Sequence, residues 1–208
     1  MKIKVCGMKN PDNIKELAKL PIDFMGMIFY EKSPRFANEL TFDDVNILPP
    51  YIEKVGVFVN AGKDYIMEKV NKYNLDLVQL HGSESVELCK ELNETIPVIK
   101  AFNVADASDF EQTKSYEEVC SYFLFDTKTP QHGGSGQKFD WQILDSYTGN
   151  RYFFLSGGIS SEDIDDIKKI QHPKFYGIDL NSRFETEPGL KDIKRLQQFI
   201  KTLTYEQD

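Results

Sequence analysis

Eight short apolar runs recur along the chain, and segments with helix signals separate them. The runs span residues 3–7, 24–29, 54–59, 75–80, 97–102, 122–126, 152–156 and 175–180. Most are nearly continuous in apolar character, which is typical of parallel strands that are covered on both faces. Eight strand-plus-helix units in 208 residues average about 26 residues each, which suits a compact barrel. The pattern therefore predicts an α/β fold of the (β/α)8 type, a TIM barrel.

Capping signals support helices between the runs. Candidate N-caps are Asn10, Thr41 and Ser160, the last two with an acidic residue three positions later that completes a possible capping box. Spaced apolar residues from Leu190 to Ile200 predict the last helix. The segment 105–119 has sparse apolar positions and gives the weakest helix signal.

An open, doubly wound sheet is the main alternative fold. Such sheets usually have fewer strands, and no G-x-G-x-x-G motif follows the first apolar run. The chain has no linker and no low-complexity tract. Residues 1–208 are therefore expected to form one domain.

Charge and cysteine content exclude several classes of partner. The 25 basic and 33 acidic residues give a net charge of -8, which disfavours nucleic acid and anionic membranes. No apolar run approaches the roughly 20 residues of a membrane span, and strand-like sequence begins too early for a signal peptide. Three cysteines without metal-ligand spacing argue against disulfides and zinc. We expect a cytoplasmic protein without a metal.

The active site of a (β/α)8 barrel lies at the carboxyl ends of its strands. Polar or reactive residues at or just after these ends are Cys6, Arg35, Asn60, His81, Asp126, Ser156 and Asp179. Cys89 and Cys120 lie elsewhere and are expected in the core.

Cys6 and Asp126 are the most reactive pair among these residues. By position alone, Cys6 is either a small buried hydrophobe or a nucleophile or base. Asp126 ends an apolar run. Its position is that of a general acid, or of a helix cap or a salt-bridge partner of Lys128. The first and sixth strands are three apart around a ring of eight. The two side chains are therefore expected to face each other across the barrel mouth, where one accepts a proton and the other donates one.

Two glycine-rich or small-residue stretches follow the last two strands. Gly157 and Gly158 follow the seventh strand and precede Ser160, and GIDLNSRFE carries small polar residues after the eighth strand. Together these two loops match the phosphate site of many barrels. A turn that needs positive φ is a compatible alternative. The polar loop 127–141 is expected to be a mobile lid, and His132 within it is expected to be exposed and without a catalytic role.

Several motifs in one order resemble phosphoribosylanthranilate isomerase of tryptophan biosynthesis. They are KVCGM, the SPR of KSPRF, VGVFVN, VQLHGSE, DTKTP to GGSGQKFDW, LSGGI and GIDLNSRFETEPGLKD, from Val5 to Asp192. The resemblance implies an Amadori rearrangement that converts N-(5-phosphoribosyl)anthranilate into 1-(2-carboxyphenylamino)-1-deoxyribulose 5-phosphate. It implies no cofactor and no metal.

The resemblance also implies roles for individual residues. Cys6 matches the general base and Asp126 the general acid, and Arg35 and His81 match residues that contact the substrate. Arg35 is a natural partner for the anthranilate carboxylate. The residues that match the phosphate loops are Gly157, Gly158, Asp179, Asn181 and Ser182. One departure is NSRFE, with Arg183 and Phe184, where the family usually has SSGVE.

The partner implied is a small phosphosugar substrate, and the chain is expected to be a monomer or a homodimer. Two other functions remain open. The related barrel isomerase of histidine biosynthesis has an aspartate at the end of its first strand, so Cys6 argues against it. A non-catalytic barrel that binds a phosphometabolite is the other, and the presence of Cys6 and Asp126 argues against it.

Overall fold

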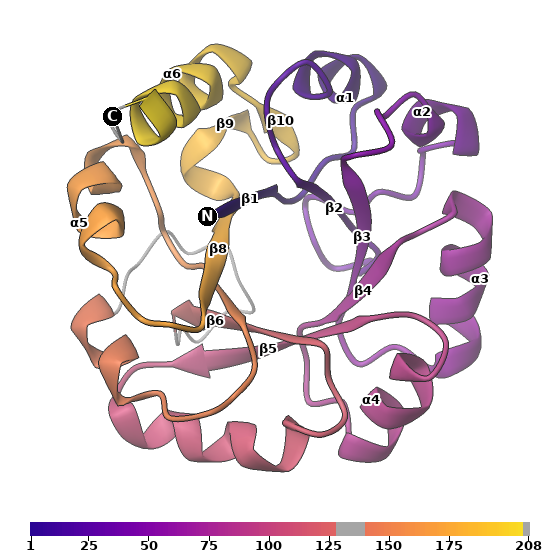
Figure 1. The fold of residues 1–208 in the computed structure, drawn as a ribbon. Coiled ribbons are helices and arrows are strands. Elements are labelled where there is room, and N and C mark those ends of the chain that lie inside the picture. The colour runs from indigo at the N-terminus through magenta and orange to yellow at the C-terminus, as the bar shows by residue number, and fades with distance from the viewer. Residues whose placement is uncertain (128–139, 206–208) are drawn as a thin grey trace.

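The eight predicted strands are all present and close into a ring (Figure 1). The computed structural model describes residues 1–127 and 140–205. The strands are β1 (Lys2–Val5), β2 (Phe24–Ile28), β3 (Glu53–Phe58), β4 (Leu77–Leu80), β5 (Val98–Val104), β6 (Tyr122–Thr127), β7 (Phe153–Leu155) and β8 (Phe175–Leu180). Each strand is parallel to its neighbours, and β8 pairs with β1 to complete the ring. The predicted (β/α)8 barrel is therefore confirmed.

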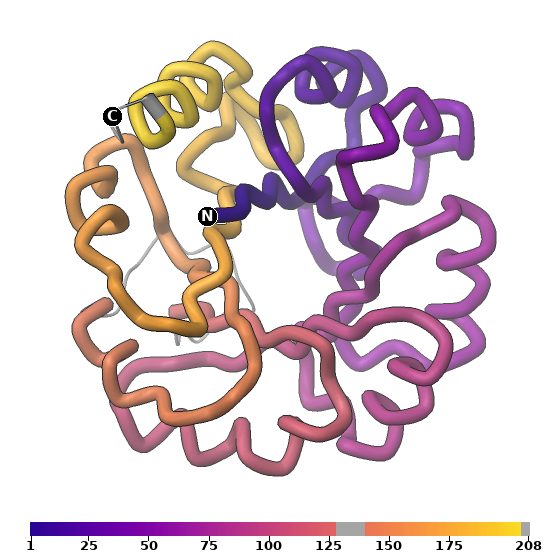
Figure 2. The backbone as a smooth tube through the Cα atoms, viewed as in Figure 1, coloured from indigo at the N-terminus to yellow at the C-terminus, as the bar shows by residue number. Residues whose placement is uncertain are grey.

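Helices surround the ring, as the backbone tube shows (Figure 2). The α-helices are α1 (Pro11–Leu17), α2 (Phe42–Asn46), α3 (Lys63–Tyr73), α4 (Val86–Asn93), α5 (Ile164–Lys169) and α6 (Ile193–Tyr205). The 3-10 helices are η1 (Ala107–Tyr116), η2 (Trp141–Ser146), η3 (Ser161–Asp163) and η4 (Ser182–Phe184).

The predicted N-caps start helices as expected. The side chain of Asn10 accepts a hydrogen bond from the amide of Asn13, and Thr41 and Ser160 each form a complete capping box. The segment 105–119 forms the 3-10 helix η1 and no α-helix, because its sparse apolar residues cannot supply an amphipathic face. A capping box at Asp106 starts it.

The last helix begins at Ile193, so the prediction that it includes Leu190 is wrong. Leu190 lies in a short antiparallel hairpin of β9 (Glu185–Glu187) and β10 (Leu190–Lys191). Gly189 makes the turn at φ +88°, a backbone conformation that ends one strand and starts the next without a Cβ clash. This hairpin carries Glu185 and Lys191 to the barrel mouth.

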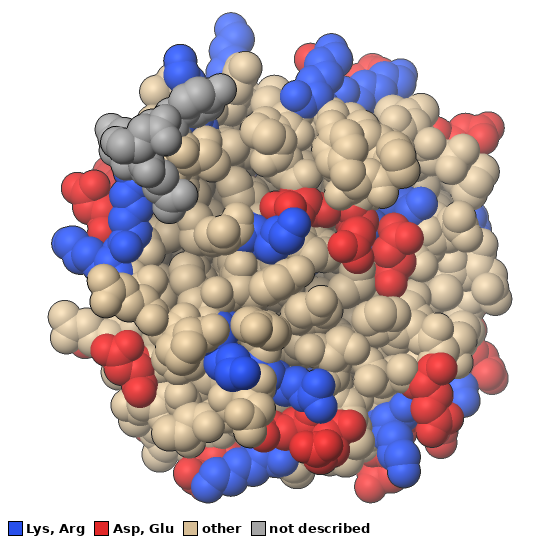
Figure 3. Space-filling model, viewed as in Figure 1, with Lys and Arg blue, Asp and Glu red and all other residues tan. Residues whose placement is uncertain are grey.

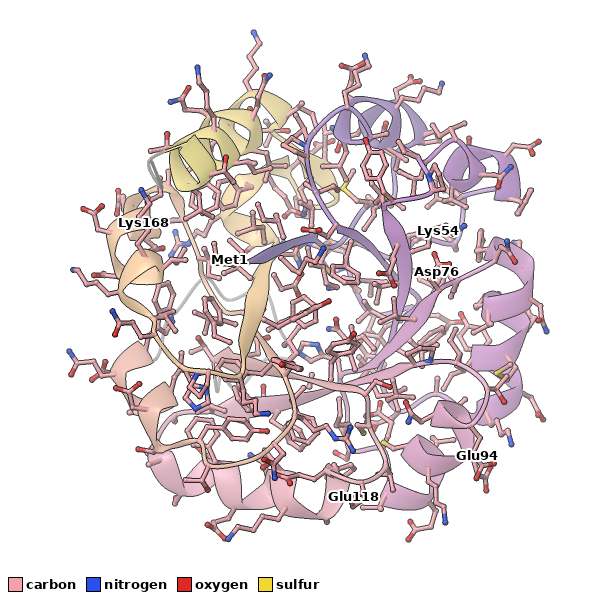
Figure 4. The ribbon with its side chains drawn as sticks, in the orientation of Figure 1. Met1, Lys54, Asp76, Glu94, Glu118 and Lys168 are labelled. Carbon is pink, nitrogen blue, oxygen red and sulfur yellow. The ribbon has the colours of Figure 1, made fainter. Side chains whose placement is uncertain are left out.

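Figures 1 and 4 look onto the end of the barrel where the strands begin. Met1 lies near the centre of this view, and Lys54 lies beside Asp76 where β3 and β4 start (Figure 4). The amide of Lys54 donates to Asp76 Oδ2 at 2.8 Å. Basic and acidic side chains are interspersed over this face (Figure 3). In the described part of the chain, no helix is long and apolar enough to cross a membrane.

Two buried clusters form the core. The larger one lies between strands and helices, and it contains Cys89 and Cys120, which confirms their predicted core positions. The smaller one draws alternate residues from the strands and lies inside the ring. Cys6 belongs to this inner cluster.

Asn13 connects α1 to the hairpin, and its replacement tests that connection. Its side-chain amide donates to the Lys191 carbonyl at 3.0 Å and accepts from the Lys191 amide at 2.7 Å. Asn13→Ala leaves both buried backbone groups unpaired, so we expect a loss of about 2 kcal/mol in the free energy of unfolding. Urea denaturation measures it, with Asp12→Asn on the exposed face of α1 as the control. Equal stability of the two variants would contradict this role.

Candidate active site

Cys6 directly follows β1 and is buried. Its amide donates to the Leu180 carbonyl at 2.9 Å, and the residue is 3% exposed. A Cβ placed on Gly26 of β2 would lie 2.7 Å from Cys6 Sγ, so only glycine leaves room for the sulfur. Burial raises the pKa of the Cys6 thiol above its ordinary value, against the opposing effect of Lys4. The thiol is therefore mostly protonated near neutral pH.

Asp179 points into the barrel and forms an ion pair. Its Oδ1 lies 2.9 Å from Lys4 Nζ, and the side chains of Lys4 and Asp179 are 0% and 5% exposed. Burial lowers the pKa of Lys4, but attraction to Asp179 and Cys6 outweighs it and holds this pKa above the ordinary value. Lys4 is therefore a buried ammonium group. The carboxylate of Asp179 is turned toward this cation, so any phosphate contact from this residue has to come from its backbone.

Asp126 and His81 lie together at the mouth, as the sequence predicts from their strand ends. Asp126 is 5% exposed, and the amide of Thr127 donates to its Oδ1 at 2.8 Å. His81 Nε2 lies 3.2 Å from Asp126 Oδ2, an electrostatic contact without hydrogen-bond geometry. Gln79 Nε2 lies 3.0 Å from His81 Nδ1. As Gln79 donates to Nδ1, the proton of a neutral imidazole faces Asp126.

Gly157 and Gly158 form a turn against Asp126. Their φ angles are +95° and +68°, in the left-handed region that favours glycine. A Cβ on Gly157 would lie 2.8 Å from Asp126 Oδ1 and 2.7 Å from the Thr127 amide nitrogen. Within the described residues, no acceptor is recorded for either glycine amide. These two amide groups lie next to the start of η3, at the place where the sequence predicts a phosphate site.

Arg35 is held by an ion network from the hairpin. Its Nε and Nη2 donate to Glu185 at 2.9 and 2.7 Å. Lys191 Nζ reaches Glu185 Oε1 at 2.5 Å and Asn181 Oδ1 at 2.8 Å. Burial raises the pKa of Glu185, but the two cations outweigh it and hold this pKa below the ordinary value. The network fixes the guanidinium of Arg35 beside the site.

Two residues after β8 depart from the family pattern, and packing explains one of them. Phe184 is fully buried, with its ring centroid 4.9 Å from that of Phe199 on α6. Arg183 is exposed, and Ser182 is half-buried at the start of η4. Phe184 therefore anchors the loop to the core and does not face the mouth.

Asn60, Ser156 and His132 are the remaining predicted residues. Asn60 has φ 51°, and its Oδ1 accepts from the Ser83 amide at 2.7 Å, so it joins the loops after β3 and β4. Ser156 is buried at the end of β7. His132 and residues 128–139 of the predicted lid at 127–141 lie outside the described residues. No group of three metal-ligating side chains occurs in 1–127 or 140–205.

Four residues of the site were not predicted as site residues. Lys4 and Gln79 each lie two positions before a predicted residue on the same strand, so the two-residue period of a strand would have found them. Glu185 and Lys191 reach Arg35 only through the hairpin, and no local pattern indicates that contact.

A closed (β/α)8 ring with buried acid–base groups and a glycine turn at its carboxyl rim is the architecture of a barrel enzyme that acts on a small phosphorylated substrate. Comparisons with known proteins define the family. The family model described as N-(5'phosphoribosyl)anthranilate (PRA) isomerase matches residues 3–202. The chain therefore belongs to the N-(5'-phosphoribosyl)anthranilate isomerase family, an isomerase family of tryptophan biosynthesis, and the resemblance predicted from the motifs is confirmed.

Individual relatives agree over nearly the whole chain. N-(5'-phosphoribosyl)anthranilate isomerase of Parabacteroides distasonis is 50% identical and covers 99% of this chain and 94% of its own. The crystal structure of the Thermotoga maritima enzyme is 35% identical, with a TM-score of 0.85 and 99% of both chains covered. A structure of the enzyme in complex with reduced 1-(o-carboxyphenylamino)-1-deoxyribulose 5-phosphate is 33% identical, with a TM-score of 0.81 and 99% of both chains covered.

Glu185→Gln tests the ion network around Arg35. Removing this carboxylate leaves two buried cations together, so we expect a loss of about 3 kcal/mol in the free energy of unfolding at neutral pH. Because the pKa of Glu185 is lowered in the folded state, its contribution is present above the unfolded pKa of about 4.3 and is lost as pH falls through the folded value. Denaturation at several pH values measures this difference. A difference that grows in acid would contradict the assignment.

Proposed function

We propose that Cys6 is the general base and Asp126 the general acid of the Amadori rearrangement of N-(5-phosphoribosyl)anthranilate in this protein. The observation that carries this assignment is that both groups are buried at the carboxyl ends of strands, β1 and β6, with two strands between them in the ring. A sugar ring bound at the mouth can then meet an acid on one side and a base on another. A partly enclosed site favours both transfers, because fixed groups replace water.

The first step needs an acid near the sugar. Asp126 gives its proton to the ribose ring oxygen, the bond between C1′ and this oxygen breaks, and the nitrogen lone pair forms the C=N bond of a Schiff base. The Thr127 amide and the Gly157 turn hold the carboxyl group in place. His81, 3.2 Å from Asp126 Oδ2, stabilises the carboxylate that this transfer leaves.

The second step needs a base near C2′. The Cys6 thiolate takes the C2′ proton, and the electron pair of that bond forms the C1′–C2′ double bond of an enolamine while the C=N electrons return to nitrogen. The enolamine then becomes the ketose by tautomerisation. The positive iminium charge of the intermediate favours the thiolate at this step.

Substrate binding is assigned to the groups around this pair. The amides of Gly157 and Gly158, with the loop of Asn181 and Ser182, are proposed to bind the phosphate. Arg35 is proposed to bind the anthranilate carboxylate, since a guanidinium group fixed by Glu185 loses little entropy on binding.

Cys6→Ser and Asp126→Asn test the catalytic pair. We expect each to lower kcat by at least ~10²-fold, as for the loss of a positioned acid or base. The decrease in anthranilate-substrate fluorescence measures turnover, and a pH–rate profile assigns each limb to its residue. An unchanged kcat in either variant removes that residue from the mechanism.

The same assay separates catalysis from binding alone. A non-catalytic barrel would bind the substrate, detected by equilibrium fluorescence titration, without converting it. Binding without turnover by the unaltered protein would favour that alternative and reject the acid–base assignment.

Arg35→Ala tests the carboxylate contact. Losing a charged hydrogen bond of about 1.5 to 3 kcal/mol should raise KM by about 10- to 100-fold with a much smaller change in kcat. Lys32→Ala is the matched control, because Lys32 is an exposed cation in the same loop. An unchanged KM for Arg35→Ala would show that another group binds the carboxylate.

We also propose a cytoplasmic enzyme that needs no cofactor, with residues 1–208 as one domain and a monomer or homodimer as the active form. The acidic net charge of -8 supports a small-molecule substrate over nucleic acid or an anionic membrane. Analytical ultracentrifugation of the purified chain determines the oligomeric state.

A further inference from the structure

Lys4 is a charged residue of the inner barrel that the steps above do not use. It lies on β1 with 0% of its surface exposed. A buried ammonium group is costly unless it is paired. Since residues two apart on a strand share a face, Lys4 and Cys6 both point into the ring.

The partner of Lys4 comes from the strand that closes the barrel. In the pairing of β1 with β8, Lys4 is the register partner of Asp179. The side chains of these two residues also meet, with Nζ 2.9 Å from Oδ1. Asp179 thus anchors the ammonium group on the face of β1 that leads to Cys6, and Gly26 leaves the sulfur its space from the other neighbouring strand.

We propose that Lys4 is a positioning residue for Cys6: its buried ammonium group, anchored by Asp179, stabilises the thiolate that takes the substrate proton. This proposal rests on the proposed role of Cys6 as the general base. In this arrangement the ammonium group lies on β1, and the reacting sulfur lies two positions later at the end of the strand.

Three charged groups face Cys6. They are Lys4 from β1, Asp179 from β8 and Lys191 from β10. Burial raises the pKa of the Cys6 thiol, Lys4 is the largest influence that lowers it, and Asp179 raises it to a smaller degree.

Other groups also act on two of these charges. Lys191 forms an ion pair with Glu185, which also pairs with Arg35. Asp126 and His81 act on Asp179 with opposite signs. Lys4 is therefore the cation to which the thiolate responds most.

A purely structural ion pair is the alternative role. The strands β1 and β8 already pair through their backbones from Lys2 to Val5, so the side-chain pair is not needed to join them. The two roles differ in a measurable quantity. If Lys4 stabilises the thiolate, removing its charge raises the pKa of Cys6, and removing the charge of Asp179 lowers it.

The experiment titrates Cys6 directly, without substrate. The ultraviolet absorbance of the thiolate is followed against pH for the unaltered protein, Lys4→Met, Asp179→Asn and the double variant, and the Cys6→Ser spectrum is subtracted to remove Cys89 and Cys120. We expect Lys4→Met to raise the pKa of Cys6 by about 1 to 3 units, Asp179→Asn to lower it, and the double variant to raise it by less than Lys4→Met. The limb on which kcat rises with pH should move to higher pH by the same amount, so that activity of Lys4→Met recovers at high pH.

The proposal can be tested even if Lys4→Met does not fold. Lys4→Met leaves a buried carboxylate unpaired and therefore destabilises the fold. If it does not fold, the double variant, which has no buried charge at this pair, and Asp179→Asn still give shifts of opposite sign. Lys2→Met, on the same strand in an exposed pair with Asp23, is the matched control and should shift nothing.

The outcomes are separable from those of the proposed function. An unchanged pKa of Cys6 in the folded double variant, or shifts of equal sign in it and Asp179→Asn, overturns the role of Lys4. Full activity of Cys6→Ser overturns the general-base assignment instead, and the titration remains readable in that case.

Discussion

The pairing of β8 with β1 is the interaction on which the rest of the site depends. It closes the ring, it places Asp179 opposite Lys4, and it holds the Cys6 amide on the Leu180 carbonyl. Without closure, Lys4 would be an unpaired ammonium group at the edge of an open sheet. With it, a buried charge pair forms two residues before the proposed base. One set of backbone hydrogen bonds thus determines both the architecture and the electrostatics of the barrel interior.

A second constraint is that the charged and titratable side chains described at the mouth lie in contact with one another. Arg35 and Lys191 share Glu185, and His81 faces Asp126. Such pairing is what allows charged groups to remain in a low-dielectric site. The contacts of Arg35 with Glu185 and of His81 with Asp126 also connect segments that are distant in sequence. The mouth is rigid on the hairpin side for this reason, and a substrate meets groups that are already oriented.

Much of the fold was predictable from local patterns. The eight apolar runs correspond to the eight strands, and the capping residues Asn10, Thr41 and Ser160 start helices where their side chains predict. The hairpin was not predictable, because β9 and β10 are too short to show alternation and Leu190 fits the helical spacing of the residues after it. The 3-10 geometry of η1 was likewise missed, since its apolar positions specify neither helix type.

The sequence by itself determined which residue types stand at the ends of the strands, and through the ordered motifs it determined the family. Strand ends are readable because hydrophobic periodicity is a local property. Only the tertiary structure decided that the carboxylate of Asp179 turns to Lys4, that Phe184 belongs to the core, and that Glu185 holds Arg35. Those outcomes depend on side chains more than a hundred residues apart in two of the three cases, and ring closure brings them within hydrogen-bond distance. No local pattern carries that information, because the partner of a buried charge depends on proximity in the folded structure and not on separation along the chain.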